Sequence, residues 1–487
     1  MAGKGSRAAR AKAKTQTTPT TGGPETQATA YLRKPAHLRT RKERTNAGRA
    51  LRADCPHESH AGFAPAARRP DPVDLLIASS AGRIEHLVPI RYGRMLASPF
   101  AFYRGAAAIM ASDLSTTPGS GVIVQACGDC HLMNFGAFAT PERRVIFDIN
   151  DFDETHPAPW EWDLKRLAAS FAIASRHNGH TRTESRAAAA AVVIHYAEKL
   201  RELAAQPTLS AWYADLDYET LIELTEDEQL KRRRRKVLDK ARSLDAAAEF
   251  VKLAHVDGGM PRIRDMPPLI FHPEEWREPG YAEAIRENLA RYRESLSAER
   301  RVLLDRYELA DVAIKVVGVG SVGTLCAVGL LFAAEDDPLF LQIKEARASV
   351  LEPYVKSPRY ASHGERVVYG QRLMQAASDI FLGHAVGALG THFYVRQLHD
   401  VKVKPLVEIF TPQNMQGFAR NTGWALARAH ARSGDPALIS GYIGKGTTFA
   451  QAIASFAMAY EEQNQRDHAA LIEAVRAGRI DASTAEA

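Results

Sequence analysis

The sequence predicts an α+β protein built from two unlike parts, a large helical lobe and a smaller lobe of antiparallel strands. Apolar residues recur at helical spacing in much of residues 61–309 and 412–487, as in WDLKRLAASFAIASRH. Residues 310–411, in contrast, are rich in glycine and β-branched residues, which indicates strands. The 487 residues are enough for about two to four domains, and a hydrophobic content of 45% supports a large core.

The first 60 residues are predicted to form a disordered basic tail. Stretches such as MAGKGSRAARAKAK contain almost no large apolar side chains, so they bury too little surface to offset the entropy of ordering. The positive charge behind the net value of +6 lies in this tail, and the rest of the chain is mildly acidic. Such a tail can make weak contacts with nucleic acid, but a solubilising role is favoured.

The composition predicts a cytoplasmic protein that does not enter a membrane. No apolar segment follows the first basic residues, as a secretory signal would require. No run approaches the roughly 20 apolar residues of a spanning helix. Four cysteines in a chain of this length do not indicate a disulfide framework.

The most informative segment is CGDCHLMNFGAFATPERRVIFDINDFD, residues 127–153. It contains Asp129, Asn134 five residues later, and then an apolar strand that ends in acids. The acids are Asp148, Asp151 and Asp153. Carboxylate and amide groups on two adjoining loops can orient a hydroxyl group and hold Mg²⁺ on a nucleotide. This segment therefore predicts phosphoryl-transfer chemistry.

A second informative segment carries the motif G-x-G-x-x-G at Gly318, Gly320 and Gly323, with Ser321 inside it. In a dinucleotide-binding fold these glycines open a helix, whereas in a kinase-type loop they join two antiparallel strands over the phosphates. Here a strand precedes the glycines, and an apolar strand, a turn and a third strand ending at Lys344 follow. That order favours the kinase-type loop.

The two segments together resemble a known superfamily. GDCHLMN is similar to the catalytic loop of aminoglycoside and choline phosphotransferases, which belong to the protein-kinase-like superfamily. DINDFDE followed by WEWDL resembles their metal-binding strand end and the helix beyond it. The whole chain also resembles an uncharacterised bacterial family built around these motifs. The resemblance implies a two-lobed kinase-like fold that binds ATP and Mg²⁺.

The resemblance also implies roles for individual residues of the helical lobe. Asp129 takes the place of the catalytic Asp that orients the acceptor, and Asn134 that of a Mg²⁺ ligand. Asp151 best matches the second metal ligand, with Asp148 as the competitor on the opposite face of an extended strand. Asp163 matches the Asp that braces the catalytic loop.

In the strand-rich lobe, Lys344 matches the catalytic Lys that binds the nucleotide phosphates. The loop Gly318–Gly323, with Ser321, matches the cover over those phosphates. The acidic partner of Lys344 is left open among Glu345, Glu352 and Glu365; Glu365 has the spacing closest to that of the superfamily.

The chain departs from the superfamily pattern in its order. The glycine loop and Lys344 normally precede the catalytic loop, but here they follow it by almost 200 residues. FARNTGWALARAHA, residues 418–431, resembles the helix that normally leads into the catalytic loop, yet it lies near the C-terminus. The initial His of the catalytic motif is Cys127. Circular permutation explains the order, and it requires Lys344 to lie close to Asp129 and Asp151.

The predicted function is an ATP- and Mg²⁺-dependent phosphotransferase. Only a short segment separates Asp151 from WDL, too short for the activation segment that presents a peptide, so a small hydroxyl- or amine-bearing acceptor is expected. The helices of residues 185–309 and Arg104 would build its pocket. The alternatives are a nucleotide-binding pseudokinase-like regulator and a dinucleotide-dependent oxidoreductase, and nucleotidyl transfer also stays open.

Two other patterns receive plainer interpretations. Cys127 and Cys130 have the spacing of half a zinc or redox site, but zinc needs two further ligands, and the phosphotransferase motif explains the segment better. The run KRRRRK, residues 231–236, could bind anions, but acidic neighbours favour a solvated helix face.

Overall fold

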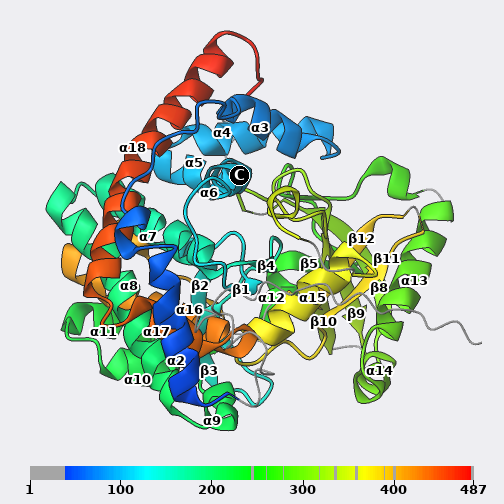
Figure 1. Ribbon diagram of the computed structural model, residues 1–487. Helices are drawn as coiled ribbons and strands as arrows, with labels where there is room; N and C mark the ends of the chain where they lie inside the picture. Colours follow the sequence, from blue (N-terminus) through cyan, green and yellow to red (C-terminus); the bar gives the residue numbers. More distant parts are fainter. Residues whose placement is uncertain are drawn as a thin grey trace, which may run out of the picture.

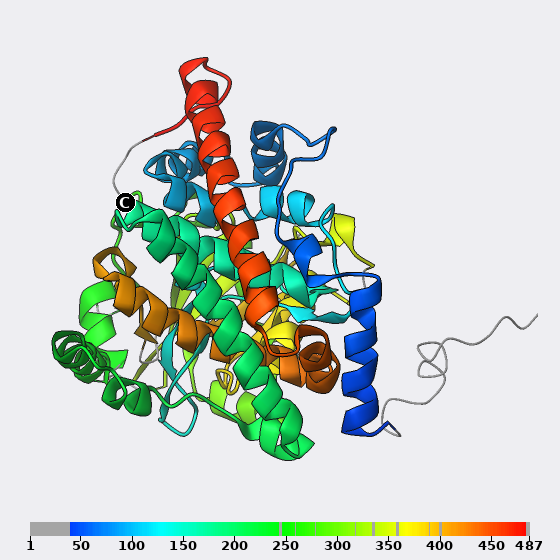
Figure 2. The same cartoon turned by 60° about the vertical axis from the view of Figure 1, so that its left-hand side comes forward.

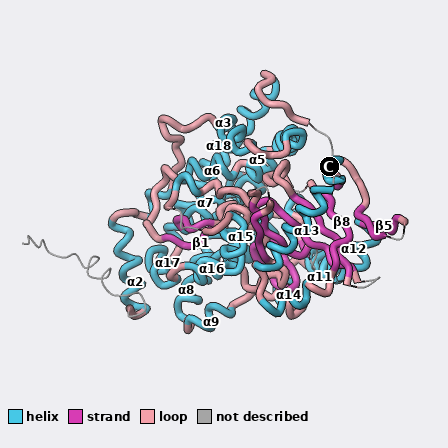
Figure 3. Tube along the Cα trace, turned by 90° about the vertical axis from the view of Figure 1, so that its right-hand side faces the viewer, coloured by secondary structure: helices cyan, strands magenta, loops and turns pink. Residues whose placement is uncertain are grey.

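The computed structural model describes residues 39–242, 246–258, 260–277, 279–316, 318–333, 337–356, 360–388, 390–398 and 402–483. The described chain is α+β, as predicted (Figure 1). Most strands gather on one side of the molecule and most helices on the other (Figure 3). None of the helices described there is both long enough and apolar enough to cross a membrane.

Long helices form most of the larger lobe. The helices that precede β8 (Glu308–Lys315) in sequence are α2 (Arg41–Ala50), α3 (Pro72–Ser80), α4 (Val88–Leu96), α5 (Pro99–Gly105), α6 (Ala107–Leu114), α7 (Trp160–His177), α8 (Arg182–Ala205), α9 (Thr208–Tyr213), α10 (Tyr218–Glu223), α11 (Glu228–Arg242), α12 (Ala246–Leu253), α13 (Pro279–Glu294) and α14 (Ala298–Leu304). The helices α16 (Pro412–Ser433), α17 (Pro436–Ile443) and α18 (Thr447–Arg476) come after the sheet. The last of these runs along the outside of α7 and α8 (Figure 2).

The smaller lobe is a six-stranded antiparallel sheet in the order β11-β12-β10-β9-β8-β7. Its strands are β7 (Ile270–Phe271), β8 (Glu308–Lys315), β9 (Cys326–Phe332), β10 (Pro338–Glu345), β11 (Gly383–Val386) and β12 (His392–Gln397). One helix, α15 (His363–Met374), connects β10 to β11 and faces the helical lobe (Figure 1). Nearly all residues of β9 and most residues of β10 are buried.

Some residues before the predicted lobe boundary, between residues 309 and 310, pack on the strand-rich lobe. Tyr292 of α13 and Leu296, two residues after this helix ends, share a hydrophobic cluster with Leu331 and Leu341 of the sheet. The hairpin of β5 (Ala254–Asp257) and β6 (Met260–Ile263) also packs on the sheet. The sequence pattern recorded helices in this region correctly, but helical periodicity does not specify which lobe a helix covers.

The centre of the helical lobe is α7, which is buried along almost its whole length. Its first residue, Trp160, stacks on Tyr196 of α8 with ring centroids 5.8 Å apart. Thr181 begins α8 with a capping box that includes Glu184. Because α7 has no solvated face, each of its polar side chains needs a partner inside the protein.

Two small sheets of the helical lobe carry the catalytic segment. One pairs β1 (Ile123–Ala126) with β4 (His156–Pro159). The other has the order β13-β2-β3 and contains β2 (Phe135–Ala139), β3 (Val145–Ile149) and β13 (Lys402–Val403). The turns between these strands place residues 127–134 and 150–155 side by side, since the Asn150 N–H donates to the Asn134 carbonyl at 2.8 Å.

The end of α16 lies beside the start of the catalytic segment, although the two are about 300 residues apart. The Ser433 hydroxyl is 3.4 Å from the Gln125 carbonyl oxygen in β1. One turn earlier, His430 Nε2 is 3.2 Å from Asp163 Oδ2. The segment 418–431 therefore lies next to β1 and to Asp163, which holds the loop that follows β1.

The prediction of a disordered tail up to residue 60 is wrong for residues 39–60, and residues 1–38 lie outside the described residues. Thr40 caps α2 with a capping box, and α2 packs along α17. The basic residues here make specific contacts: Arg44 pairs with Asp435 at 2.9 Å, and Arg52 donates to the Gly441 and Tyr442 carbonyls. Partners near the C-terminus, invisible in the local composition, order this segment.

Candidate functional site

The loop of residues 127–134, called the catalytic loop after its predicted role, is held from inside the helical lobe. One carboxylate, that of Asp163 on α7, accepts hydrogen bonds from the N–H groups of Cys127 at 2.6 Å and Gly128 at 3.0 Å. Gly128 has a φ of +85°, and a Cβ there would lie 2.2 Å from the Glu154 carbonyl oxygen, so only glycine fits. Asp163 thus occupies the bracing position expected from the sequence.

Asp129 projects from this loop and forms an ion pair with Arg166 of α7. The Arg166 Nε donates to Asp129 Oδ1 at 2.7 Å, and a second guanidinium nitrogen contacts the same oxygen. The guanidinium also lies 4.6 Å from the centroid of the Tyr103 ring. Burial raises the pKa of Asp129, and the Arg166 charge opposes that rise.

Sequence reasoning missed Arg166. Its signal was present in WEWDLKRL, because Arg166 follows Asp163 by three residues, nearly one helical turn. Both side chains therefore point from one face of α7 toward the same loop. Only Oδ1 of Asp129 is hydrogen-bonded to Arg166. The other oxygen, Oδ2, has no hydrogen bond to any described residue and lies 3.8 Å from His131 Nε2.

Asn134 lies at the end of the same loop, in the short 3-10 helix η5 (Leu132–Asn134). Its Nδ2 donates to the Asp129 carbonyl at 2.8 Å. That bond fixes the orientation of the amide and directs Oδ1 away from the loop backbone. An oxygen held in this way is a suitable ligand for Mg²⁺.

Asp148 and Asp151 have opposite environments. Asp148 is fully buried; both of its carboxylate oxygens accept from Arg428 of α16 at 2.8 Å, and one accepts from the Ala376 N–H. Asp151 follows the strand, and its side chain keeps 35% of its surface exposed. The carboxylate that is open to a metal is therefore that of Asp151, whereas Asp148 ties β3 to α16.

Lys344 lies near the end of strand β10, and its side chain contacts the acids that follow β3. Its Nζ donates to Asp153 at 2.5 Å and lies 4.0 Å from Asp151. The Tyr394 hydroxyl of β12 donates to the other oxygen of Asp153, and its ring lies 5.3 Å from Nζ. These contacts join segments that are 191 residues apart in sequence.

The charges in this cluster support one another. Although burial lowers it, the pKa of Lys344 stands well above its usual value because Asp151 and Asp153 surround the ammonium. Burial and repulsion from Asp153 raise the pKa of Asp151. Burial also acts on Asp153, but Lys344 and Tyr394 outweigh it and lower its pKa.

None of the three candidate glutamates pairs with Lys344. The Glu345 carboxylate accepts from the Leu325 N–H at 2.9 Å, that of Glu352 from the Ser349 N–H at 3.1 Å, and that of Glu365 from the Ala361 N–H. Glu365 sits in the first turn of α15 and serves its N-terminus. The acidic partner of Lys344 is instead Asp153, in the DFD of residues 151–153, and sequence reasoning did not assign it to this role.

The glycine loop joins β8 to β9, which are antiparallel neighbours. Its glycines therefore do not open a helix, the arrangement that a dinucleotide-binding fold requires. The loop is tied to the sheet, since the Glu345 N–H donates to the Leu325 carbonyl at 2.7 Å. Ser321 lies at its tip, where its carbonyl accepts the Thr324 hydroxyl at 2.8 Å.

Arg83, in the connection after α3, and Arg94 of α4 hold the glycine loop from outside. Arg83 donates to the Gly320 carbonyl at 2.8 Å and to the Val322 carbonyl at 2.7 Å. Arg94 donates to the Gly318 carbonyl at 2.5 Å. Composition and motifs gave no sign of these contacts, because arginines in a helix are usually solvated.

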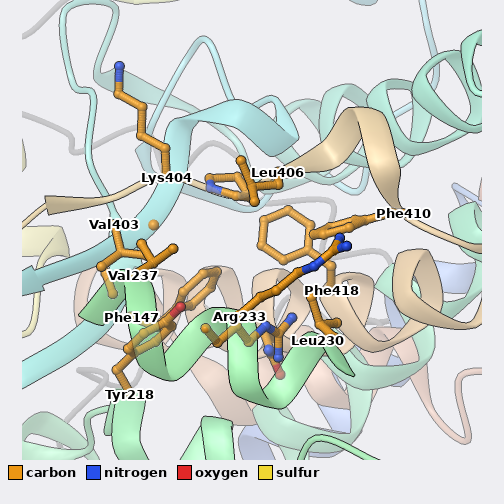
Figure 4. Close-up of a pocket in the computed structure, with 15 residues that line it drawn as sticks. Phe147, Tyr218, Leu230, Arg233, Val237, Val403, Lys404, Leu406, Phe410 and Phe418 are labelled. Carbon is orange, nitrogen blue, oxygen red and sulfur yellow. The ribbon is translucent and has the colours of Figure 1, made fainter. Parts of the chain in front are cut away.

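Two hollows of the described chain have linings that include none of Lys344, Asp151 and Asp153. One, of about 740 Å³ and partly open to solvent, lies behind the acids and includes Asn150, Gln375 and Arg396 in its lining. The other lies between α11, α16 and β13 and is mostly apolar (Figure 4). The basic run borders this second hollow, and its Lys231 and Arg235 pair with Glu223, as expected for a solvated helix face.

The cysteine spacing does not mark a metal site within the described chain. Cys127 and Cys130 are buried and free, and among the described residues no group of three His, Cys, Asp or Glu is placed to hold a metal ion. The Cys127 thiol donates to the Asp151 carbonyl at 3.3 Å. It thus connects the catalytic loop to the acidic loop.

A family model described as an uncharacterized protein conserved in bacteria (DUF2252) matches residues 83–474. This match covers most of the chain, so the protein belongs to that family. It includes the catalytic loop, the glycine loop and Lys344, and it begins at Arg83 in the segment that holds the glycine loop. No curated protein and no solved structure matches the chain. The expected membership of an uncharacterised bacterial family is confirmed.

Proposed function

We propose that the protein is an ATP- and Mg²⁺-dependent phosphotransferase with a circularly permuted, kinase-like fold, and that it acts on a small hydroxyl- or amine-bearing acceptor. The observation that carries the proposal is the position of the Lys344 ammonium. It donates to Asp153 and lies 4.0 Å from the Asp151 carboxylate. A lysine from the strand lobe and carboxylates from the helical lobe converge on one point, as a phosphate and its metal require.

The order of the elements supports the nucleotide-binding role. The chain has the order of elements found in a kinase-type nucleotide lobe: β8, the glycine loop, β9, β10 with Lys344, and then α15. The contact of Ser433 with Gln125 fits a permuted connection, because α16 ends where β1 begins. The loop and Lys344 would hold the phosphates.

Mg²⁺ would be bound by Asn134 and Asp151. Mg²⁺ commonly uses one or two protein oxygens and takes its remaining ligands from phosphates and water. The fixed amide of Asn134 and the partly exposed carboxylate of Asp151 match this donor set. Asp148 does not, because Arg428 engages both of its oxygens.

Asp129 would receive the acceptor. The acceptor oxygen or nitrogen attacks the γ-phosphorus, the bond between that phosphorus and the β–γ bridging oxygen breaks, and ADP leaves with the electron pair. The proton of the acceptor passes to Asp129 Oδ2, the carboxylate oxygen that Arg166 does not engage. Arg166 keeps the carboxylate in place for this role.

The proposal is tested by titrating the full chain with ATP and with NAD, each with and without Mg²⁺. We expect ATP to bind in a Mg²⁺-dependent manner. Asp151→Asn should abolish the Mg²⁺ dependence, and Lys344→Met should weaken ATP binding at least tenfold. Asp239→Asn, which removes an exposed carboxylate on α11, is the matched control and should bind as the unaltered chain does. Binding of NAD without binding of ATP would overturn the proposal.

A catalytically silent regulator is the second candidate, and one observation favours it. Lys344 pairs with Asp153, an acid of the metal loop, instead of with a helix glutamate. A screen of metabolites for ATP consumption separates the two functions, and identifying ADP or AMP as the product separates phosphoryl from nucleotidyl transfer. Tight ATP binding without any turnover would support the regulator.

A further inference from the structure

The N-terminal helices α3 to α5, which belong to the helical lobe, form a wall beside the glycine loop. Arg83 and Arg94 hold the glycine loop by its carbonyls. On the other side, Arg69 pairs with Asp113 and with Asp467 of α18. This wall is therefore anchored to the helical lobe while it touches the glycine loop (Figure 1).

Arg104, in the last turn of α5, lies between the glycine loop and the catalytic loop. A Cβ at Gly320 would be only 3.3 Å from the Arg104 carbonyl oxygen, so the two backbones are in close approach. The Arg104 charge opposes the rise in the pKa of Asp129 and adds to the lowering of the pKa of His131. The Arg104 backbone thus lies beside the glycine loop, and its charge acts on two residues of the catalytic loop.

The guanidinium of Arg104 is not committed to a partner in the described part of the chain. Its Nε is buried and has no hydrogen bond there, and burial lowers its pKa against the weaker attraction of Asp129 and Glu408. Its neighbours are engaged: Arg91 contacts Ser79, Ser80 and the Gly105 carbonyl. Asp129 already has Arg166 as its partner.

Arg104 is partly buried, and taking a cation even partly out of water without a close anion costs folding free energy. Such a residue is accounted for if an anion completes its environment during function. Between a glycine loop and an acceptor carboxylate, the group that develops negative charge is the phosphoryl group in transfer, on its three equatorial oxygens.

We propose that Arg104 binds the transferred γ-phosphoryl group of the nucleotide and stabilises its charge in the transition state, as an arginine finger supplied within the same chain. This inference rests on the proposed phosphotransferase function and adds a residue from the N-terminal helices. Arg104 contacts the equatorial oxygens, Lys344 the other phosphates, and Asp129 the acceptor.

The test uses Mg²⁺-ADP with and without aluminium fluoride, which together imitate the group in transfer. Transition-state analogues bind at least ~10²-fold more tightly than ground-state ligands, so aluminium fluoride should tighten Mg²⁺-ADP binding by about that factor. Arg104→Ala should reduce the tightening to a few-fold and leave the Kd of Mg²⁺-ADP alone within about threefold, because the finger contacts only the missing phosphoryl group.

Two further variants control this measurement. Arg104→Lys keeps the charge but not the planar fork, so it should recover part of the tightening even if Arg104→Ala proves poorly folded. Arg68→Ala removes an exposed arginine just before α3 and should retain all of it. Full tightening in Arg104→Ala, or Mg²⁺-ADP binding by the unaltered chain that aluminium fluoride does not tighten, overturns the inference alone. Absence of any Mg²⁺-ADP binding by the unaltered chain instead counts against the proposed function.

Discussion

Two parts of the molecule are held in different ways: the catalytic loop with the acids behind it, called the catalytic wall, and the glycine loop, called the glycine wall. The catalytic wall is fixed from within by buried charge: Asp163 holds the loop backbone, and Asp148 pairs with Arg428, each with only 1% of its side chain exposed. The glycine wall is held from outside by Arg83 and Arg94, which donate to backbone carbonyls in partly exposed positions.

This difference separates a preformed surface from an adjustable one. A broken buried ion pair leaves an uncompensated charge in a medium of low polarity, so the catalytic wall has no inexpensive alternative arrangement. An arginine on a carbonyl near the surface can exchange that bond for one to water at little net cost. We therefore expect residues 127–134 to stay rigid while the glycine loop opens and closes.

The largest effect is expected from the two neighbouring acids of the catalytic wall. Asp148→Asn leaves Arg428 buried and unpaired and should lower the free energy of unfolding by about 3–5 kcal/mol. Asp151→Asn should change it by less than about 1 kcal/mol, because Asp151 is partly exposed. Chemical denaturation of both variants measures the contrast. Equal losses of stability would show that the catalytic wall is not held by buried charge.

A smaller effect is expected at the glycine wall. Arg83→Ala removes the donor to two carbonyls and should lower the free energy of unfolding by about 1–3 kcal/mol. The amide hydrogens of residues 318–325 should then exchange faster in hydrogen–deuterium exchange, while those of residues 127–134 keep their protection. Arg68→Ala is the control for loss of a cation without a contact. Unchanged exchange at residues 318–325 would mean that the loop is closed by other contacts.

The smallest effect concerns Glu154, which lies between the two walls. Burial, with Asp129 and Asp153 nearby, raises its pKa from 4.5 to about 7, although the Val350 N–H and Arg366 act in the opposite direction. A raised pKa in the folded state means that stability present below pH 4.5 is lost as pH rises through about 7. Glu154→Gln does not lose this stability as pH rises. The Tm of the variant minus that of the unaltered chain should therefore increase between pH 5 and pH 8. Parallel Tm profiles would place the titration elsewhere.

Some of the site could be predicted from the sequence because its signals are local. Asp129, Asn134 and Asp163 lie within one segment of strand, loop and helix, and Asp163 braces the loop as expected. The strand order around the glycines indicated the β8–β9 hairpin, and strands pair most readily with their neighbours in sequence.

Other features could not be read locally. The partner of Lys344 was sought among nearby glutamates, but it is Asp153, which lies almost 200 residues earlier. The tail seemed disordered by composition, yet residues 41–50 form α2 against α17. In both cases the deciding partner is remote in the chain, and no periodicity or spacing records such a contact.

The sequence by itself determined the α+β class, the positions of most helices and strands, and the chemical types gathered in the catalytic segment. These depend on periodicity, turn residues and motif spacing, which act over a few residues. Only the tertiary structure decided that Asp148 pairs with Arg428, that Arg166 meets Asp129 and that Arg83 holds the glycine loop. Those pairings follow from burial, because a charge removed from water must take whichever partner the packing of distant segments supplies.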